Sequence, residues 1–198
     1  MNQKVIKYSI MAVAYAAVLY PLSVWFKNSN LTLSTISPVT IFPAFGLIAF
    51  TLLWLHSMSG VFETQIRKHL DFDKFVHRTS IIILVSIILH PLLLIAYFDF
   101  NIKNLSAAID KYIRLGIIGW ILLITYDIGK ALRKYKFFSK NWNNILIIST
   151  IGFLLTFFHS LYLGSDLQSG PLRIIWIFYG VTAILATIYT YGIKRLVV

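Results

Sequence analysis

Two histidines, His90 and His159, are the residues of this sequence whose type and placement could do chemistry. Each lies inside an apolar stretch long enough to cross a membrane, residues 72–97 and 142–163. Hydrocarbon cannot satisfy imidazole nitrogens, so a histidine in such a stretch normally faces a bundle interior, a partner or a ligand. Two neutral imidazoles from neighbouring helices at one depth could supply both axial ligands of a haem iron, because the porphyrin provides the other four.

The alternatives to haem are a simple metal site and ordinary packing. The chain has no cysteine, which excludes thiolate ligation, and no acidic residue lies in the central part of an apolar stretch. A mononuclear metal normally needs a third or fourth protein ligand, so haem is favoured over zinc. Each imidazole could instead merely hydrogen-bond a neighbouring helix. His69 lies in a polar connection, where solvation is the simplest interpretation, and His56 could act on the inner side alongside His77.

The composition indicates an integral membrane protein. Hydrophobic residues make up 58% of the 198 residues and charged residues only 13%, against about 25% in ordinary soluble domains. The mean hydropathy is +0.77. The net charge of +11 comes from short basic runs between apolar stretches, a pattern that reflects membrane orientation and excludes nucleic acid as the partner.

Six apolar stretches predict six membrane-spanning helices. They cover residues 8–26, 41–62, 75–98, 112–128, 142–163 and 171–192. Each is close to the length of about 20 residues that a bilayer requires. The sequence therefore predicts an all-α, six-helix bundle that crosses the cell membrane repeatedly, as a single domain over residues 1–198.

The basic residues predict the orientation of these helices. One side of the membrane receives 13 of the 18 cations: Lys4, Lys7, Arg67, Lys68, Lys74, Arg78, Lys130, Arg133, Lys134, Lys136, Lys140, Lys194 and Arg195. The other side receives Lys27, Lys103, Lys111, Arg114 and Arg173. The first side, with both termini, should be cytoplasmic. The third and fifth helices then run outward, and His90 and His159 both lie in the outer half. His77 lies about 20 Å further in than His90.

Several motifs resemble one family of membrane proteins. They are LDFDKFVHRTS, ILHPLLL and, after a basic loop, a Trp-led helix with FFHSLYLGSDLQSGPLR. These motifs resemble the ferric reductase-like transmembrane domain, found in ferric reductases, NADPH oxidases and the MsrQ haem subunit. The resemblance covers most of the chain from the second helix to the sixth. It implies a bundle that binds b-type haem and carries electrons from a cytoplasmic flavin to an outer acceptor, with His90 and His159 as the outer haem ligands.

The sequence departs from this family pattern in the inner haem pair. The family pattern places a partner for His77 in the fifth helix, 13 residues before His159, and that position is Leu146. One haem b is therefore favoured, and two would require an unusual partner for His77, such as His56. Two arginines are candidates for the haem propionates, Arg78 on the inner side and Arg173 on the outer side. Both could equally be interfacial anchors.

The electron donor is expected on another protein or in the membrane. Six helices occupy most of the chain, and it contains no GxGxxG fingerprint for a dinucleotide. A cytoplasmic flavoprotein reductase carrying FMN or FAD, or a quinol, would supply electrons to this oxidoreductase subunit. The basic run from Lys130 to Lys140 could dock an acidic donor or a flavin phosphate at the cytoplasmic face, or reflect membrane orientation alone. Ferric iron, oxygen or a periplasmic protein could be the acceptor. The competing interpretation is a membrane subunit without haem. It would be either an assembly or transport subunit or a degenerate member of the family.

Overall fold

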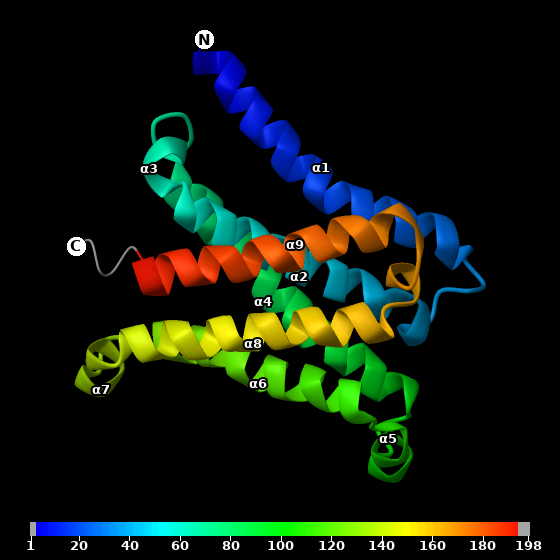
Figure 1. The fold of residues 1–198 in the computed structure, drawn as a ribbon. Helices are drawn as coiled ribbons and strands as arrows, with labels where there is room; N and C mark the ends of the chain where they lie inside the picture. The colour runs from blue at the N-terminus through cyan, green and yellow to red at the C-terminus, as the bar shows by residue number, and fades with distance from the viewer. Residues whose placement is uncertain (1–2, 194–198) are drawn as a thin grey trace. The chain divides into compact units, whose positions relative to one another are not determined.

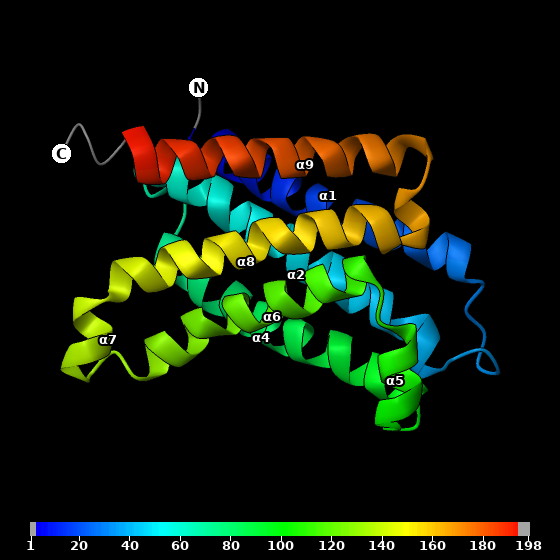
Figure 2. The same ribbon diagram turned by 60° about the horizontal axis from the view of Figure 1, so that its bottom comes forward.

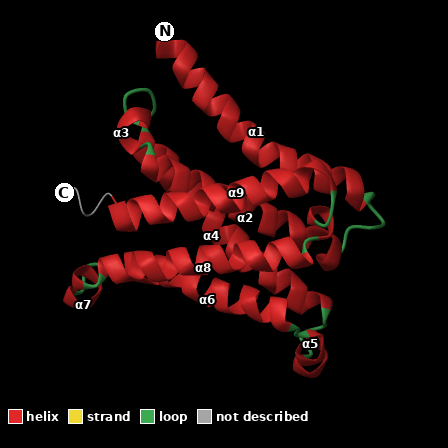
Figure 3. Cartoon of the chain, in the orientation of Figure 1, coloured by secondary structure: helices red, strands yellow, loops and turns green. Residues whose placement is uncertain are grey.

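The prediction of an all-α membrane protein is confirmed. In the computed structural model, which describes residues 3–193, there are helices and no strand (Figure 3). Six of the helices within residues 3–193 are long and apolar enough to cross a membrane. The chain divides into two compact units between Leu105 and Ser106, and each unit is described by itself below. Lys194 and Arg195, counted on the predicted cytoplasmic side, and both chain ends lie outside residues 3–193.

The first unit contains three long helices, labelled in Figure 1. They are α1 (Gln3–Ser29), α2 (Pro38–Val61) and α4 (Phe72–Tyr97). The helix α2 packs against both α1 and α4. At one end of the α1–α2 pair, the indole Nε1 of Trp25 donates a hydrogen bond to the carbonyl of Thr40 at 3.3 Å. This unit therefore has α2 at its centre, with α4, the helix that carries His90 and His77, along one side.

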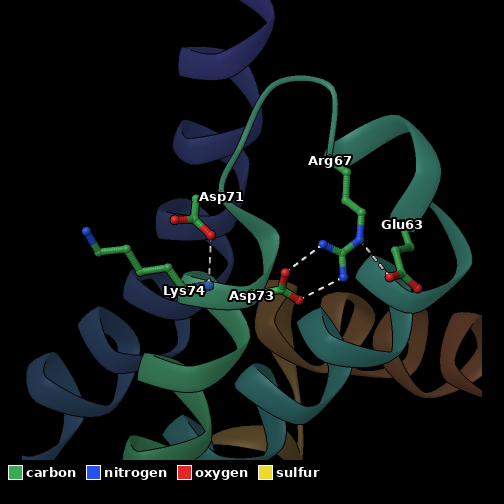
Figure 4. A network of polar contacts seen from close by, with 5 residues as sticks. All are labelled: Glu63, Arg67, Asp71, Asp73 and Lys74. Atoms are coloured by element: carbon green, nitrogen blue, oxygen red, sulfur yellow. Dashed lines mark hydrogen bonds and ion pairs between the residues drawn. The ribbon is translucent and has the colours of Figure 1, made fainter.

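A network of charged side chains fixes the turn between α2 and α4 (Figure 4). The short helix α3 (Glu63–Ile66) leads to Arg67, whose guanidinium bonds the carboxylates of Glu63 and Asp73 at 2.8 Å. These hydrogen bonds raise the pKa of Arg67 above its ordinary value. The carboxylate of Asp71 accepts from the backbone N–H of Lys74 at 3.0 Å and so caps the start of α4.

The second unit is built on an antiparallel pair of helices. They are α6 (Lys111–Ala131) and α8 (Trp142–Leu163), joined by the short helix α7 (Lys136–Lys140) (Figure 2). Their backbones approach closely where Gly119 faces Gly152. A Cβ atom at Gly152 would lie 2.7 Å from the carbonyl oxygen of Gly119, so a larger residue has no room there. Small residues at such crossings are typical of membrane helices, which associate by close packing.

The last long helix packs on α8 in the same unit. After the turn η1 (Ser165–Leu167) comes α9 (Gly170–Ile188), which continues as a π-helical turn, η2 (Tyr189–Ile193). Trp176 of α9 is completely buried, and its indole Nε1 donates to the hydroxyl of Ser160 on α8 at 2.9 Å. This bond is made next to His159 in the sequence, so α9 braces the part of α8 that carries that histidine.

The observed helices start and end at somewhat different residues from the predicted ones. The helices α1, α2 and α4 begin at Gln3, Pro38 and Phe72 rather than at residues 8, 41 and 75. A helix can begin in the headgroup region, where polar side chains cap it, so apolarity alone marks only its central part. The short helices α3, α5 (Ile102–Ala108) and α7 were not predicted, because each falls in a polar connection without helical periodicity.

Candidate functional site

The imidazole of His90 is held by the backbone of the neighbouring helix in the first unit. Its Nδ1 lies 2.8 Å from the carbonyl oxygen of Phe42, near the start of α2. A carbonyl oxygen can only accept, so Nδ1 carries the proton and donates it. In the neutral ring the lone pair then belongs to Nε2. This arrangement fixes both the direction of the ring and the nitrogen that can bind a metal.

A glycine makes room for this ring. A Cβ atom added at Gly46, also on α2, would lie 3.0 Å from both Cε1 and Nδ1 of His90. Contacts that short are tighter than ordinary van der Waals separation, so the ring lies directly against the backbone at Gly46. The ring of Phe42 is 5.2 Å from the imidazole, measured between centroids, and covers another part of it. His90 is half-buried in this contact.

His159 has the same surroundings in the second unit. Its Nδ1 donates to the carbonyl oxygen of Tyr112 at 2.9 Å, near the start of α6. A Cβ atom at Gly116 would lie 2.6 Å from Cε1 of His159 and closer still to Nδ1, so this ring approaches its glycine more tightly than His90 does. In both units the carbonyl that accepts the bond is four residues before the glycine. The neutral His159 ring therefore also has its lone pair on Nε2.

Three further contacts brace the surroundings of His159. Oδ1 of Asp110 accepts hydrogen bonds from the backbone N–H groups of Tyr112 and Ile113 at 2.8 and 2.7 Å, which caps the first turn of α6. The ring of Tyr112 stacks on that of Tyr162 with their centroids 4.2 Å apart. Together with the bond from α9 to α8, these contacts fix α6 and α8 at the level of the histidine.

The other histidines have different surroundings. Nε2 of His56 lies 2.5 Å from the hydroxyl of Thr79, and that hydroxyl donates to the carbonyl of Phe75 at 2.7 Å. Because the hydroxyl proton is used on Phe75, Nε2 of His56 is the donor and its lone pair is on Nδ1. His77 is exposed. His56 contacts Thr79 and the ring of Phe75 on α4. His77 lies about 200° around the axis of α4 from each of these two residues, so the structure does not bring it to His56.

The remaining predicted site residues are placed as follows. Arg78 is exposed on α4, in the first unit. Arg173 is half-buried at the start of α9, where its Nη1 donates to the carbonyl of Leu167 at 2.8 Å and ties α9 to the preceding turn. Leu146 lies on α8, where its carbonyl accepts from the hydroxyl of Thr150 at 2.8 Å. His69 is half-buried in the α3–α4 turn, and its Nδ1 lacks a hydrogen-bond partner among the residues that the structure describes.

The cations of the basic run are exposed, and three of them, Lys130, Arg133 and Lys134, lie beside aromatic rings. The guanidinium of Arg133 lies 4.4 Å from the centre of the Trp142 ring, and Nζ of Lys134 lies 5.3 Å from that of Tyr135. The helix α7 adds the exposed ring of Phe137. Cations over aromatic faces are common where a membrane protein meets the headgroup region, and this placement serves either anchoring or docking.

Gly46 and Gly116, with the carbonyls of Phe42 and Tyr112, are site residues that the sequence did not single out. A glycine inside an apolar helix was the available signal, because it weakens a helix unless close packing requires it. His90 belongs to the first unit and His159 to the second. Comparisons with protein-family models, with curated proteins and with solved structures found no match to this chain.

Proposed function

We propose that this chain is a b-type haem protein of the cell membrane that carries electrons between its two faces, with His90 and His159 as the axial ligands. The observation that carries the proposal is that both imidazoles donate Nδ1–H to a backbone carbonyl. Histidines that bind metals almost always use their second ring nitrogen in this way. The bond selects the tautomer whose Nε2 lone pair can coordinate iron and holds the ring in one direction.

The donor set suits haem in particular. Bound haem would supply an iron that changes between the ferric and ferrous states by one electron. The protein would need to provide only two ligands to that iron. The carbonyls of Phe42 and Tyr112 make the imidazoles more basic by accepting their Nδ1 protons, and this stabilises a more highly charged metal. The apolar helices around each ring lower the local dielectric constant and limit the access of water. The resemblance to the ferric reductase-like transmembrane domain points to the same ligands.

The proposal contains one haem. His77 is exposed, His56 donates through Nε2 to Thr79, and Leu146 occupies the position of the missing inner histidine. His77 and Leu146 do not repeat the arrangement of His90 and His159, in which Nδ1 of a histidine is held by a helix carbonyl beside a glycine. Arg78 and Arg173 are the proposed partners of the haem propionates. Arg173 uses Nη1 on Leu167, and a guanidinium has four further N–H donors.

The electron path begins at the predicted cytoplasmic side. A flavoprotein reductase carrying FMN or FAD, or a membrane quinol, would deliver electrons there, and the basic run from Lys130 to Lys140 would attract an acidic donor. An acceptor on the outer side would take the electrons: ferric iron, oxygen or a periplasmic protein. The chain would then act as one subunit of an oxidoreductase, together with a separate reductase.

An absorption spectrum of the detergent-purified protein tests the proposal. We expect one haem per chain with a six-coordinate b-type spectrum, and loss of that spectrum in both His90→Ala and His159→Ala. His56→Ala is the matched control, because it removes a half-buried histidine that bonds a neighbouring helix through the other ring nitrogen. A folded protein from haem-replete cells without a Soret band would refute the proposal and leave a membrane subunit whose histidines only pack.

A further inference from the structure

We infer that Gly46 and Gly116 are positioning residues for His90 and His159, because each leaves space that a Cβ atom would fill and that the imidazole occupies while it bonds the carbonyl four residues earlier. This inference rests on the proposed function for its purpose, but its geometry stands on the contacts themselves. It begins with the way an α-helix covers its own carbonyl groups.

Within a helix, the carbonyl of residue i accepts the N–H of residue i+4. Its second lone pair is directed past the side chain of residue i+4. Serine and threonine show how close that side chain is, because at position i+4 they often donate their own hydroxyl to the carbonyl of residue i. A donor from a different helix shares this space with that side chain. A small side chain can leave room for a slender donor, as Ala44 does for the Trp25 indole at the Thr40 carbonyl, and a glycine at i+4 leaves room for a whole imidazole ring against the helix backbone.

Both histidines use such an opening. His90 donates to the carbonyl of Phe42 and lies against Gly46, and His159 donates to the carbonyl of Tyr112 and lies against Gly116. In each case the glycine is residue i+4 relative to the acceptor. The same arrangement occurs independently in two units, on two pairs of helices, and it involves the two histidines that the sequence places deepest in long apolar helices. The glycines therefore set the direction of Nε2 through the bond at Nδ1.

The structure supplies controls for each glycine. Gly60 is on α2 with Gly46, and a Cβ atom there would meet no atom within 4 Å. Gly119 is on α6 with Gly116, and the three atoms nearest to a Cβ there belong to Thr156 and Gly152, beginning with Cγ2 of Thr156 at 2.9 Å. Gly60→Ala thus tests glycine loss without contact, and Gly119→Ala tests disturbed helix packing at a glycine whose nearest neighbours are not an imidazole.

The test is nitrogen NMR of the detergent-solubilised full chain, labelled with ¹⁵N-histidine and free of haem. A neutral imidazole in water prefers the Nε2–H tautomer, so rings held as Nδ1–H give distinct signals. We expect one such signal from His90 and one from His159, assigned by removing each histidine. Gly46→Ala should abolish the first and Gly116→Ala the second. Gly60→Ala and Gly119→Ala should leave both in place. Retention of both Nδ1–H signals in Gly46→Ala and Gly116→Ala would overturn the inference.

A double substitution covers the possibility that Gly116→Ala does not fold. If the added Cβ clashes only with the imidazole, then combining Gly116→Ala with His159→Ala should restore the folded yield of His159→Ala alone. Failure to restore it would show that Gly116 serves helix packing, and it would refute the positioning role.

The ferric EPR spectrum of the haem-loaded protein separates this inference from the proposed function. The g-values of a bis-histidine haem depend on how the two imidazole planes are oriented, so Gly46→Ala should shift them while Gly60→Ala should not. Unchanged g-values in Gly46→Ala would overturn the inference while leaving the haem ligands intact. If the wild-type chain binds no haem but its Nδ1–H signals respond as expected, the proposed function fails and the role of the glycines stands.

Discussion

The carboxylate of Asp110 caps the turn of α6 that offers its carbonyl to His159, because Oδ1 accepts the backbone N–H of Tyr112 at 2.8 Å. The acceptor of the imidazole is thus held in place by the residue two positions before it. Removing the cap should act on the histidine as well as on the helix.

Asp110→Ala should lower the free energy of unfolding by about 0.5–2 kcal/mol, the usual effect of losing an N-cap. The Nδ1–H signal of His159 should also broaden or shift, because the Tyr112 carbonyl loses its support. Thermal melting and ¹⁵N-histidine NMR measure the two effects. Asp71→Ala is the matched control, since Asp71 caps α4 at the end away from His90. Equal changes of the histidine signals in both variants would contradict the local link.

The contact between α9 and α8 predicts a second effect. Trp176→Phe removes the indole donor to Ser160 within a fully buried position, and we expect a loss of about 1–3 kcal/mol from the missing bond and the smaller ring. In the Ser160→Ala background, Trp176→Phe should cost less, because the hydrogen bond is already absent. A double-mutant cycle on thermal unfolding measures the coupling. Strictly additive losses would show that the hydrogen bond does not stabilise the α8–α9 contact.

The crossing of α6 and α8 predicts the most damaging glycine substitution. Gly152→Ala would place Cβ 2.7 Å from the Gly119 carbonyl oxygen and 2.8 Å from the Leu123 nitrogen. Backbone atoms cannot rotate away, so we expect a loss on the order of 1–3 kcal/mol or more. Gly60→Ala is the control and should be neutral or stabilising by up to about 1 kcal/mol, because alanine favours helix. Folded yield after mild heating compares the two. A Gly152→Ala protein as stable as Gly60→Ala would disprove the close approach.

Neutralising the basic run should slow electron delivery if an acidic donor docks there. We expect Lys134→Gln with Lys136→Gln to lower the rate of haem reduction by the donor several-fold at low salt, and to have little effect at high salt, where charges are screened. Lys4→Gln with Lys7→Gln removes the same charge on the same predicted side. Stopped-flow measurement of haem reduction at two salt concentrations compares the two double variants. Equal rates in both double variants would assign the run to membrane orientation.

The sequence predicted the fold class because the length of each apolar stretch can be read directly from the order of the residue types. It also pointed to His90 and His159, since an imidazole in hydrocarbon needs a partner. It did not predict that the partner would be a backbone carbonyl, because backbone groups are identical at every position and no residue type marks them. Gly46 and Gly116 were visible, but a helical glycine has several packing explanations, and only the contact with the ring distinguishes these two. The helix starts depended on polar caps such as Asp71, which hydropathy ignores.

The use of backbone acceptors has a consequence for which substitutions the chain can accept. A carbonyl is present whatever the side chain, so positions 42 and 112 are free to differ, and they do differ, as phenylalanine and tyrosine. Their side chains can serve other contacts, as the stacking of Tyr112 on Tyr162 shows. In related chains, we expect variety at these two positions. Glycine four residues later should instead be kept or lost together with the histidine that lies against it.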